Sequence, residues 1–196
     1  MKVALYFGSF NPVHVGHLII AQALLNTAQV DRVWLVVSPQ NPFKDKKSLL
    51  PQADRLLLCE LATEGHPQIQ ASNVEFMLPQ PSYTIDTLTH LAARYPSYAF
   101  SLLMGEDNLR SLHRWKNHRA IVDHYPIYLY PRRAKEGDEA AAPEVAEHPN
   151  VHRIAAPLLD ISATEIRQMV KDKRSVRYVV TDAVRRYVED KYLYHD

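Results

Sequence analysis

Residues 8–17 read GSFNPVHVGH and directly follow a short apolar run from Val3 to Phe7. A continuous apolar run of this length that stops at a glycine is typical of a central strand in a parallel sheet. Spaced apolar residues from about Val15 to Ala28 predict a helix. The stretch therefore predicts a strand, a tight turn and a helix in succession.

The predicted turn and helix start are suited to binding phosphate. The first N–H groups of a helix have no partner within it, and the helix dipole favours anions there. Gly8 and Ser9 follow the strand, and Gly16 lacks a side chain, so a phosphate could approach closely. His14 and His17 are three residues apart and should share a helix face. Two imidazoles there could donate hydrogen bonds to a polyphosphate and to charge that develops during phosphoryl transfer.

The rest of the chain continues the alternation of strands and helices. Further strands are predicted at Val33 to Val37, Ile69 to Phe76, Tyr98 to Met104, Tyr125 to Tyr130 and Val151 to Ala155. Further helices are predicted at Gln52 to Glu64, Ile85 to Tyr95, Ser162 to Lys171 and Thr181 to Lys191. Two segments predict loops: the polar, lysine-bearing one from Asn41 to Pro51, and a mobile one from Arg132 to Asn150, which has few large apolar residues.

This alternation predicts a doubly wound α/β fold with a mostly parallel, Rossmann-like sheet. We expect a single domain over residues 1–196, with a helical C-terminal part from residue 162 to residue 196. Ligands of such sheets bind beyond the carboxyl ends of the strands, near the point where the strand order reverses. Gly8 and Gly105 both fall at predicted strand ends.

Composition narrows the function classes. The chain has 196 residues, 46% of them hydrophobic and 23% charged, as in ordinary globular domains. A net charge of +1 provides no basic excess for nucleic acid, and no apolar run reaches the ~18–20 residues that span a bilayer. The only cysteine, Cys59, excludes an internal disulfide and a cysteine-based metal site, and we expect it to be buried. We expect a cytoplasmic protein with no nucleic-acid or membrane partner.

The pattern Gly-x-Phe-x-Pro-x-His-x-Gly-His in residues 8–17 resembles the nucleotidyltransferase superfamily, which shares its His-x-Gly-His signature with class I aminoacyl-tRNA synthetases. Within that superfamily, the whole chain looks like the bacterial nicotinate-nucleotide adenylyltransferases. The resemblance implies that ATP and nicotinate mononucleotide are the substrates. It also implies that ATP is bound by Gly8, Ser9, Phe10 and Gly16, and that His14 and His17 are catalytic.

The segment Ser82-Tyr83-Thr84-Ile85-Asp86-Thr87 supports the narrower resemblance. Taken locally, Thr84 could cap the following helix, and Asp86 in the first turn suits the helix dipole. In the family, a Ser-Tyr-Thr-x-Asp-Thr segment borders the pyridine-nucleotide site. The resemblance therefore implies that Tyr83, Thr84 and Asp86 bind nicotinate mononucleotide.

A third segment contains Gly105 and Asp107 and is followed by Trp115. A carboxylate just past a strand end is well placed to accept hydrogen bonds from ribose hydroxyls. The resemblance implies that Gly105 and Asp107 hold the ribose of ATP and that Trp115 stacks on the pyridine ring. An indole beside an aromatic ligand is physically reasonable, and core packing is the alternative for Trp115.

The fourth segment runs from Asp160 to Arg167. Ser162 and Glu165 have the spacing of a capping box, and a capped helix start is also an anion site. Arg167 lies one turn into this helix and could place its guanidinium fork on phosphate oxygens. The family pattern Ile-Ser-Ser/Ala-Thr-x-Ile-Arg implies that Ile161, Ser162 and Thr164 bind ATP and that Arg167 is catalytic.

Position 43 departs from the family pattern. The family often has Pro-His-Lys where this chain has Pro42-Phe43-Lys44. Lys44 still matches, and it is predicted to contact the mononucleotide phosphate, whereas any role at position 43 is in doubt.

The resemblance implies that the mononucleotide phosphate attacks ATP and releases pyrophosphate. Mg²⁺ would bind with ATP, held by phosphates and water, and no protein metal site is predicted. The alternatives are phosphopantetheine adenylyltransferase, which lacks the Ser-Tyr-Thr-x-Asp-Thr and Gly-x-Asp…Trp combination, and a non-catalytic nucleotide sensor. A cytidylyltransferase would carry Arg-Thr-x-Gly-Ile-Ser-Thr-Thr, which is missing here. The choice between the acid and the amidated mononucleotide stays open, as does a homo-oligomer.

Overall fold

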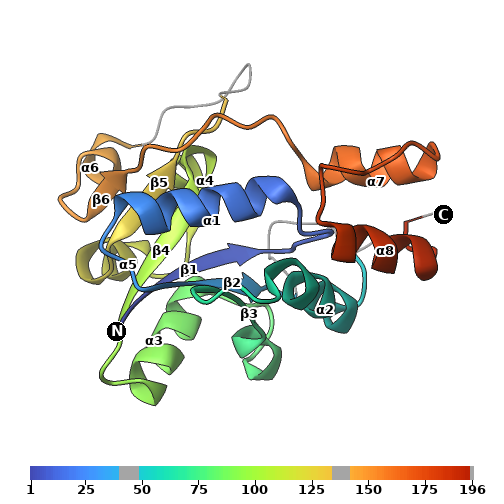
Figure 1. The fold of residues 1–196 in the computed structure, drawn as a ribbon. Coiled ribbons are helices and arrows are strands. Elements are labelled where there is room, and N and C mark those ends of the chain that lie inside the picture. Colours follow the sequence, from blue (N-terminus) through green and yellow to red (C-terminus); the bar gives the residue numbers. More distant parts are fainter. Residues whose placement is uncertain (40–48, 134–141, 195–196) are drawn as a thin grey trace.

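A computed structural model describes residues 1–39, 49–133 and 142–194 of the chain. Its centre is a parallel sheet with the strand order β3-β2-β1-β4-β5-β6 (Figure 1). The strands are β1 (Lys2–Gly8), β2 (Arg32–Val37), β3 (Ile69–Ser72), β4 (Ala99–Gly105), β5 (Ile127–Tyr130) and β6 (Val151–Arg153). The predicted doubly wound α/β fold is confirmed.

Helices cover both faces of the sheet. On one face lie α1 (Val15–Thr27), α2 (Gln52–Thr63), α7 (Ala163–Lys171) and α8 (Asp182–Asp190). The other face carries α3 (Thr84–Arg94), α4 (Glu106–Ser111), α5 (His118–His124) and α6 (Pro143–Ala146). Two short 3-10 helices, η2 (Val74–Met77) and η3 (Leu112–Arg114), join these elements.

The core forms because successive residues of each strand point to opposite faces of the sheet. In β1, Ala4 and Tyr6 pack into one layer, whereas Val3 and Leu5 pack into the other. Both layers are lined mainly by fully buried aliphatic side chains. Strands buried on two faces read as continuous apolar runs, which is why β1, β2 and β4 could be recognised from the sequence. Cys59 of α2 is buried, as predicted.

The predicted strand from Ile69 to Phe76 is only half correct. The strand stops at Ser72, and η2 follows at Val74. The Ser72 hydroxyl accepts a 3.4 Å hydrogen bond from the Val74 N–H, and the Asn73 carbonyl accepts a 2.9 Å one from the Phe76 N–H. These turn-type bonds end the ladder, because Ser and Asn readily offer the backbone local alternatives to sheet pairing.

The prediction of a mobile loop from Arg132 to Asn150 is wrong for the described part of that segment. Residues 142–150 contain α6, and Val145 is buried in the core. The Asn150 side chain donates hydrogen bonds to the carbonyls of Val122 and Asp123, at 2.9 and 3.0 Å. These contacts come from a distant part of the chain, so local composition could not reveal them.

Other differences are smaller. Helix α3 begins at Thr84, and its N-cap is Tyr83, so Thr84 lies inside the first turn and is not the cap. Helices α4 and α5 were not predicted, because six and seven residues are too few for a 3.6-residue period to be recognised. Among the described residues, no helix combines the length and the apolar character needed to cross a membrane.

Candidate active site

The carboxyl ends of β1 and β4 border a cavity of about 310 Å³ in the described structure, which we call the main cavity of the site. These two strands are neighbours, and the strand order reverses at them, with β2 and β3 on one side and β5 and β6 on the other. This is the place at which doubly wound sheets bind ligands. Six predicted site residues line the cavity: Gly8, His17, Tyr83, Thr84, Asp107 and Trp115.

A second, smaller hollow adjoins the first beside the start of α1. It is lined by His14, Gly16, His17 and Ile161 from the predicted set. Tyr6, His17, Tyr130 and Arg132 line both hollows, so the two are parts of one site. The fold thus brings the His-x-Gly-His segment next to Asp107 and Trp115, which lie about 100 residues away in the sequence.

His14 and His17 form a close pair at the start of α1. Their ring centroids are 3.7 Å apart with an interplanar angle of 31°. His14 is the extended N-cap residue, and its N–H donates a 3.2 Å hydrogen bond to Nδ1 of His17 in the first turn. Burial, together with the positive charge of Arg132, lowers the pKa of His14 to about 4. Its imidazole is therefore neutral near pH 7 and can donate one hydrogen bond.

Gly16 has a neighbour that explains its identity. A Cβ atom built on Gly16 would lie 2.9 Å from Nδ1 of His14. Glycine therefore leaves room for the imidazole itself, in addition to the space for phosphate that the sequence suggested. After His14, the next residue that such a Cβ would meet is Ile161, whose Cβ would lie 3.7 Å away.

Phe10 has a packing role beneath the turn. Its side chain is 3% exposed and its ring contacts those of Tyr6 and His17, with centroids 5.9 and 5.0 Å apart. A Cβ on Gly8 would lie 2.9 Å from this ring, so Gly8 allows Phe10 to fold back beneath the turn. The predicted contact between Phe10 and ATP is thereby restricted to its main chain, which has a positive φ of 46°.

Helix α7 contacts the turn that follows β1. Ser162 and Glu165 form the predicted capping box: the Ser162 hydroxyl accepts a 3.2 Å hydrogen bond from the Glu165 N–H, and the Glu165 carboxylate accepts one from the Ser162 N–H. Arg167 donates a 2.8 Å hydrogen bond to the carbonyl of Asn11 and a 3.3 Å one to the Thr164 hydroxyl. The fourth predicted segment therefore touches the first.

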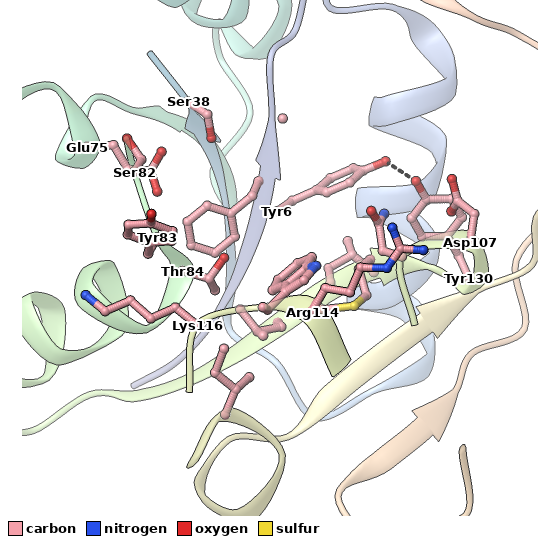
Figure 2. A pocket seen from close by; sticks show the side chains of 18 of the residues that line it. Tyr6, Ser38, Glu75, Ser82, Tyr83, Thr84, Asp107, Arg114, Lys116 and Tyr130 are labelled. Atoms are coloured by element: carbon pink, nitrogen blue, oxygen red, sulfur yellow. Dashed lines mark hydrogen bonds between the residues drawn. The ribbon is translucent and has the colours of Figure 1, made fainter. Parts of the chain in front are cut away.

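Tyr83 and Thr84 lie at the other end of the main cavity, and Figure 2 shows them beside Ser82 and Glu75. Asp86 forms an ion pair with Lys116, with 2.8 Å between Oδ2 and Nζ. The Lys116 ammonium also lies 4.9 Å from the centre of the Tyr83 ring. Asp86 does not line the cavity. Its ion pair holds Lys116, which does line this end of the cavity.

Asp107 and Trp115 border the cavity on the β4 side. Asp107 faces Arg132, with 3.9 Å between Oδ2 and Nε. A Cβ on Gly105 would overlap the Asp107 carboxylate and lie 2.9 Å from the Arg132 side chain, so glycine lets these two side chains approach each other. Trp115 is half-buried and packs against the core while also lining the cavity, so core packing accounts for part of its surface and stacking on a pyridine ring stays a prediction.

Sequence reasoning missed several buried groups at the site. The Tyr6 hydroxyl donates a 3.0 Å hydrogen bond to the Tyr130 hydroxyl, as Figure 2 shows, and burial raises the pKa of both phenols. Glu75, buried at the cavity wall, accepts a 2.9 Å hydrogen bond from the Thr87 hydroxyl, and burial raises its pKa. A carboxylate inside a segment that reads as a strand was the only available signal.

Some predicted residues lie elsewhere. Lys44 and Phe43 lie outside the described residues. Several described residues of the predicted set line neither hollow and adjoin the site through the contacts above or along the chain. They are Ser9, Phe10, Asp86, Gly105, Ser162, Thr164 and Arg167. The described residues contain no group of three or more His, Cys, Asp or Glu side chains that could hold a metal ion.

Known proteins match this chain over most of its length. Residues 5–169 match the protein family described as cytidylyltransferase-like. A protein of Cytophaga hutchinsonii, named "Probable nicotinate-nucleotide adenylyltransferase", is 48% identical over 99% of this chain and 98% of its own length. A protein of Bacteroides fragilis with the same name is 41% identical over 93% of this chain and 89% of its own. This chain belongs to the nicotinate-nucleotide adenylyltransferase family.

The fold of this family is also found among solved structures. The Plasmodium falciparum nicotinic acid mononucleotide adenylyltransferase, complexed with NaAD, superposes with a TM-score of 0.79 over 98% of this chain and 97% of that one. At 18% identity, this likeness concerns the fold alone. This member of the nicotinate-nucleotide adenylyltransferase family therefore shares its α/β fold with that solved structure, and the site described above lies in the shared fold.

Proposed function

We propose that this protein transfers the adenylyl group of ATP to nicotinate mononucleotide, giving nicotinate adenine dinucleotide and pyrophosphate in NAD biosynthesis. The observation that carries the proposal is the joined pair of hollows. The smaller hollow is lined by the histidine pair beside a helix start, and the main cavity is lined by Thr84, Asp107 and Trp115. We expect a polyphosphate, a ribose and an aromatic ring to occupy separate parts of such a site.

The reaction requires positioning and charge stabilisation. An oxygen of the mononucleotide phosphate attacks the α-phosphorus of ATP, the bond from that phosphorus to the pyrophosphate oxygen breaks, and pyrophosphate leaves with the electron pair. The attacking phosphate has a second pKa near ~6 and is mostly dianionic at neutral pH, so no general base is required. We expect His14, His17 and Arg167 to surround the α-phosphate and the leaving group.

Each remaining predicted residue has a place in this proposal. The main chain at Gly8, Ser9, Phe10 and Gly16 and the capped start of α7, with Ile161, Ser162 and Thr164, would hold the triphosphate. Asp107, beside Gly105, would accept hydrogen bonds from ribose, and Trp115 would stack on the pyridine ring. Tyr83 and Thr84, with Asp86 behind them, would border that ring, and Lys44 would contact the mononucleotide phosphate.

Mg²⁺ would enter as part of the substrate, bound to ATP. A magnesium ion usually keeps several waters and binds through substrate phosphates with few protein ligands, which suits a site lined by imidazole and guanidinium groups. It would neutralise charge on the departing pyrophosphate. The absence of a nucleic-acid or membrane partner, the cytoplasmic location and a homo-oligomer stay predictions.

The test is pyrophosphate release from MgATP upon addition of nicotinate mononucleotide, with the dinucleotide identified by mass. Nicotinamide mononucleotide and phosphopantetheine are assayed in parallel, and CTP replaces ATP in a further arm. Turnover that depends on nicotinate mononucleotide supports the proposal, and the ratio of kcat/KM between acid and amide decides the substrate preference. ATP binding without turnover on any acceptor would favour a sensor and overturn the proposal.

A further inference from the structure

Arg55 of α2 is a buried charged residue that the proposed mechanism does not use. The residue is only 1% exposed, and Glu75 is the other charged residue of the described core that is buried as deeply. Burying a guanidinium is costly unless its N–H groups find acceptors. Such a residue in the middle of a helix needs an explanation.

The guanidinium of Arg55 donates four hydrogen bonds to main-chain carbonyls. Nη1 reaches the carbonyls of Ser9 and Ser38, both at 2.7 Å. Nη2 reaches that of Pro39 at 3.1 Å, and Nε reaches that of Leu50 at 3.0 Å. Hydrogen bonds from a charged donor are about twice as strong as neutral ones. Among the described residues, no carboxylate forms an ion pair with Arg55, so these carbonyls solvate its charge.

The four acceptors come from three separate backbone segments. Ser9 follows β1, Ser38 and Pro39 follow β2, and Leu50 precedes α2. Figure 1 shows α2 beside the end of β2. The two strand ends are already joined by a 2.9 Å hydrogen bond from the Ser38 N–H to the Gly8 carbonyl. Beyond that bond the sheet ladder stops, and Nη1 of Arg55 supplies the next connection between the two segments.

The segment held in this way is the proposed phosphate-binding turn. Arg55 holds Ser9 from one side, and Arg167 holds Asn11, two residues further on, from the other. The Asn11 side chain in turn accepts hydrogen bonds from the Leu50 N–H and the Tyr194 hydroxyl, at 3.2 and 2.9 Å. Of the two arginines, only Arg55 is almost completely buried, so it acts on the turn from behind.

We propose that Arg55 is a positioning residue for adenylyl transfer, which holds the main chain of Ser9 so that the turn from Gly8 to His17 keeps its ATP-binding geometry. The proposal rests on the proposed function of that turn. It requires an arginine, because one ammonium group cannot span acceptors on three segments, whereas a planar guanidinium can. A misplacement of about 1 Å in a phosphate site can reduce the rate by up to roughly 10²-fold.

The experiment compares Arg55→Lys and Arg55→Met with Leu58→Ala, a control in the same helix. Leu58 is fully buried and packs in the core, so its truncation lowers stability without removing a carbonyl contact. The measurements are Tm, kcat, the KM of each substrate, and the Kd of ATP by calorimetry without mononucleotide. We expect both Arg55 variants to weaken ATP binding by about tenfold or more, with the mononucleotide KM changed less than threefold. We expect Leu58→Ala to shift Tm alone.

Rescue provides a second readout. In Arg55→Ala, added methylguanidinium should recover part of the lost affinity for ATP, and it should leave Leu58→Ala unchanged. Equal loss of affinity for both substrates, or Arg55 variants that match Leu58→Ala in ATP affinity, would overturn the proposal. Failure of Arg55→Lys and Arg55→Met to fold would assign Arg55 to stability alone and would also overturn it. Because the Kd of ATP needs no turnover, the outcome is separable from failure of the proposed reaction.

Discussion

Nη1 of Arg167 lies 2.8 Å from the carbonyl oxygen of Asn11 and donates a hydrogen bond to it, although the two residues are 156 positions apart. This bond joins helix α7 to the turn that follows β1. The two segments that we propose to hold the ATP triphosphate are therefore directly connected.

Removal of the His17 imidazole should reduce kcat strongly. His17 lines both hollows, and loss of a single charge-stabilising donor typically costs a factor of ~10²–10³. We expect His17→Ala to lower kcat by about that factor, with Tm little changed. His124→Ala, at an exposed histidine of α5, serves as the control and should keep full activity. Near-normal turnover of His17→Ala would remove the histidine pair from the mechanism.

His14 should make stability depend on pH. Its folded pKa of about 4 is below the usual value of 6.5, so the unfolded chain binds more protons between these two pH values. Stability from the neutral imidazole is therefore complete above pH ~6.5 and is lost as the pH falls towards ~4. The contribution of His14 to the free energy of unfolding changes by at most about 3 kcal/mol over this pH range.

The measurement for His14 is chemical denaturation across this pH range. His14→Asn keeps a polar side chain without a titratable group, so its free energy of unfolding should fall less steeply between pH 6.5 and pH 4 than that of the native protein. Identical slopes would show that His14 is not held neutral by the fold. Between pH 6.5 and 8, we expect the two profiles to run parallel.

Gly16→Ala should damage catalysis more than stability. The added methyl would lie 2.9 Å from Nδ1 of His14 and would push the imidazole out of place. We expect kcat to fall by about tenfold or more, because orientation within the site is the main source of rate. Gly65→Ala is the control: it has a φ of 74° and strains the backbone far from the site. It should lower Tm and leave kcat unchanged, and the opposite ranking would contradict this account.

Trp115→Ala should affect the mononucleotide more than ATP. Trp115 lines the main cavity and would lose its stacking surface for an aromatic ring, an effect of about tenfold in KM. Steady-state kinetics with each substrate varied in turn provides the comparison. Trp34→Phe, in the buried core of β2, should change Tm and neither KM. If Trp115→Ala raised the KM of ATP more, the pyridine ring would have to be placed elsewhere.

The sequence alone determined the features that local patterns encode. Strands buried on both faces appear as apolar runs, and capped helix starts have their own residue spacing, so β1, β2, β4 and the capping box of α7 were predictable. The His-x-Gly-His turn likewise indicated a phosphate site and, through its resemblance, a family. The resemblance at Ser82 to Thr87 and at Trp115 narrowed the expected substrates of that family to pyridine nucleotides.

Only the tertiary structure decided what distant segments do to one another. Burial beside Arg132 lowers the pKa of His14, and Gly16 is required because that imidazole lies against it. The segment that contains helix α6 depends on contacts from elsewhere in the chain, so local composition misled there. Arg55 shows the limit most clearly: in the sequence it is an ordinary helical arginine, and only folding brings three carbonyl-bearing segments around it. A hydrogen bond depends on distance in space, which spacing along the chain does not specify.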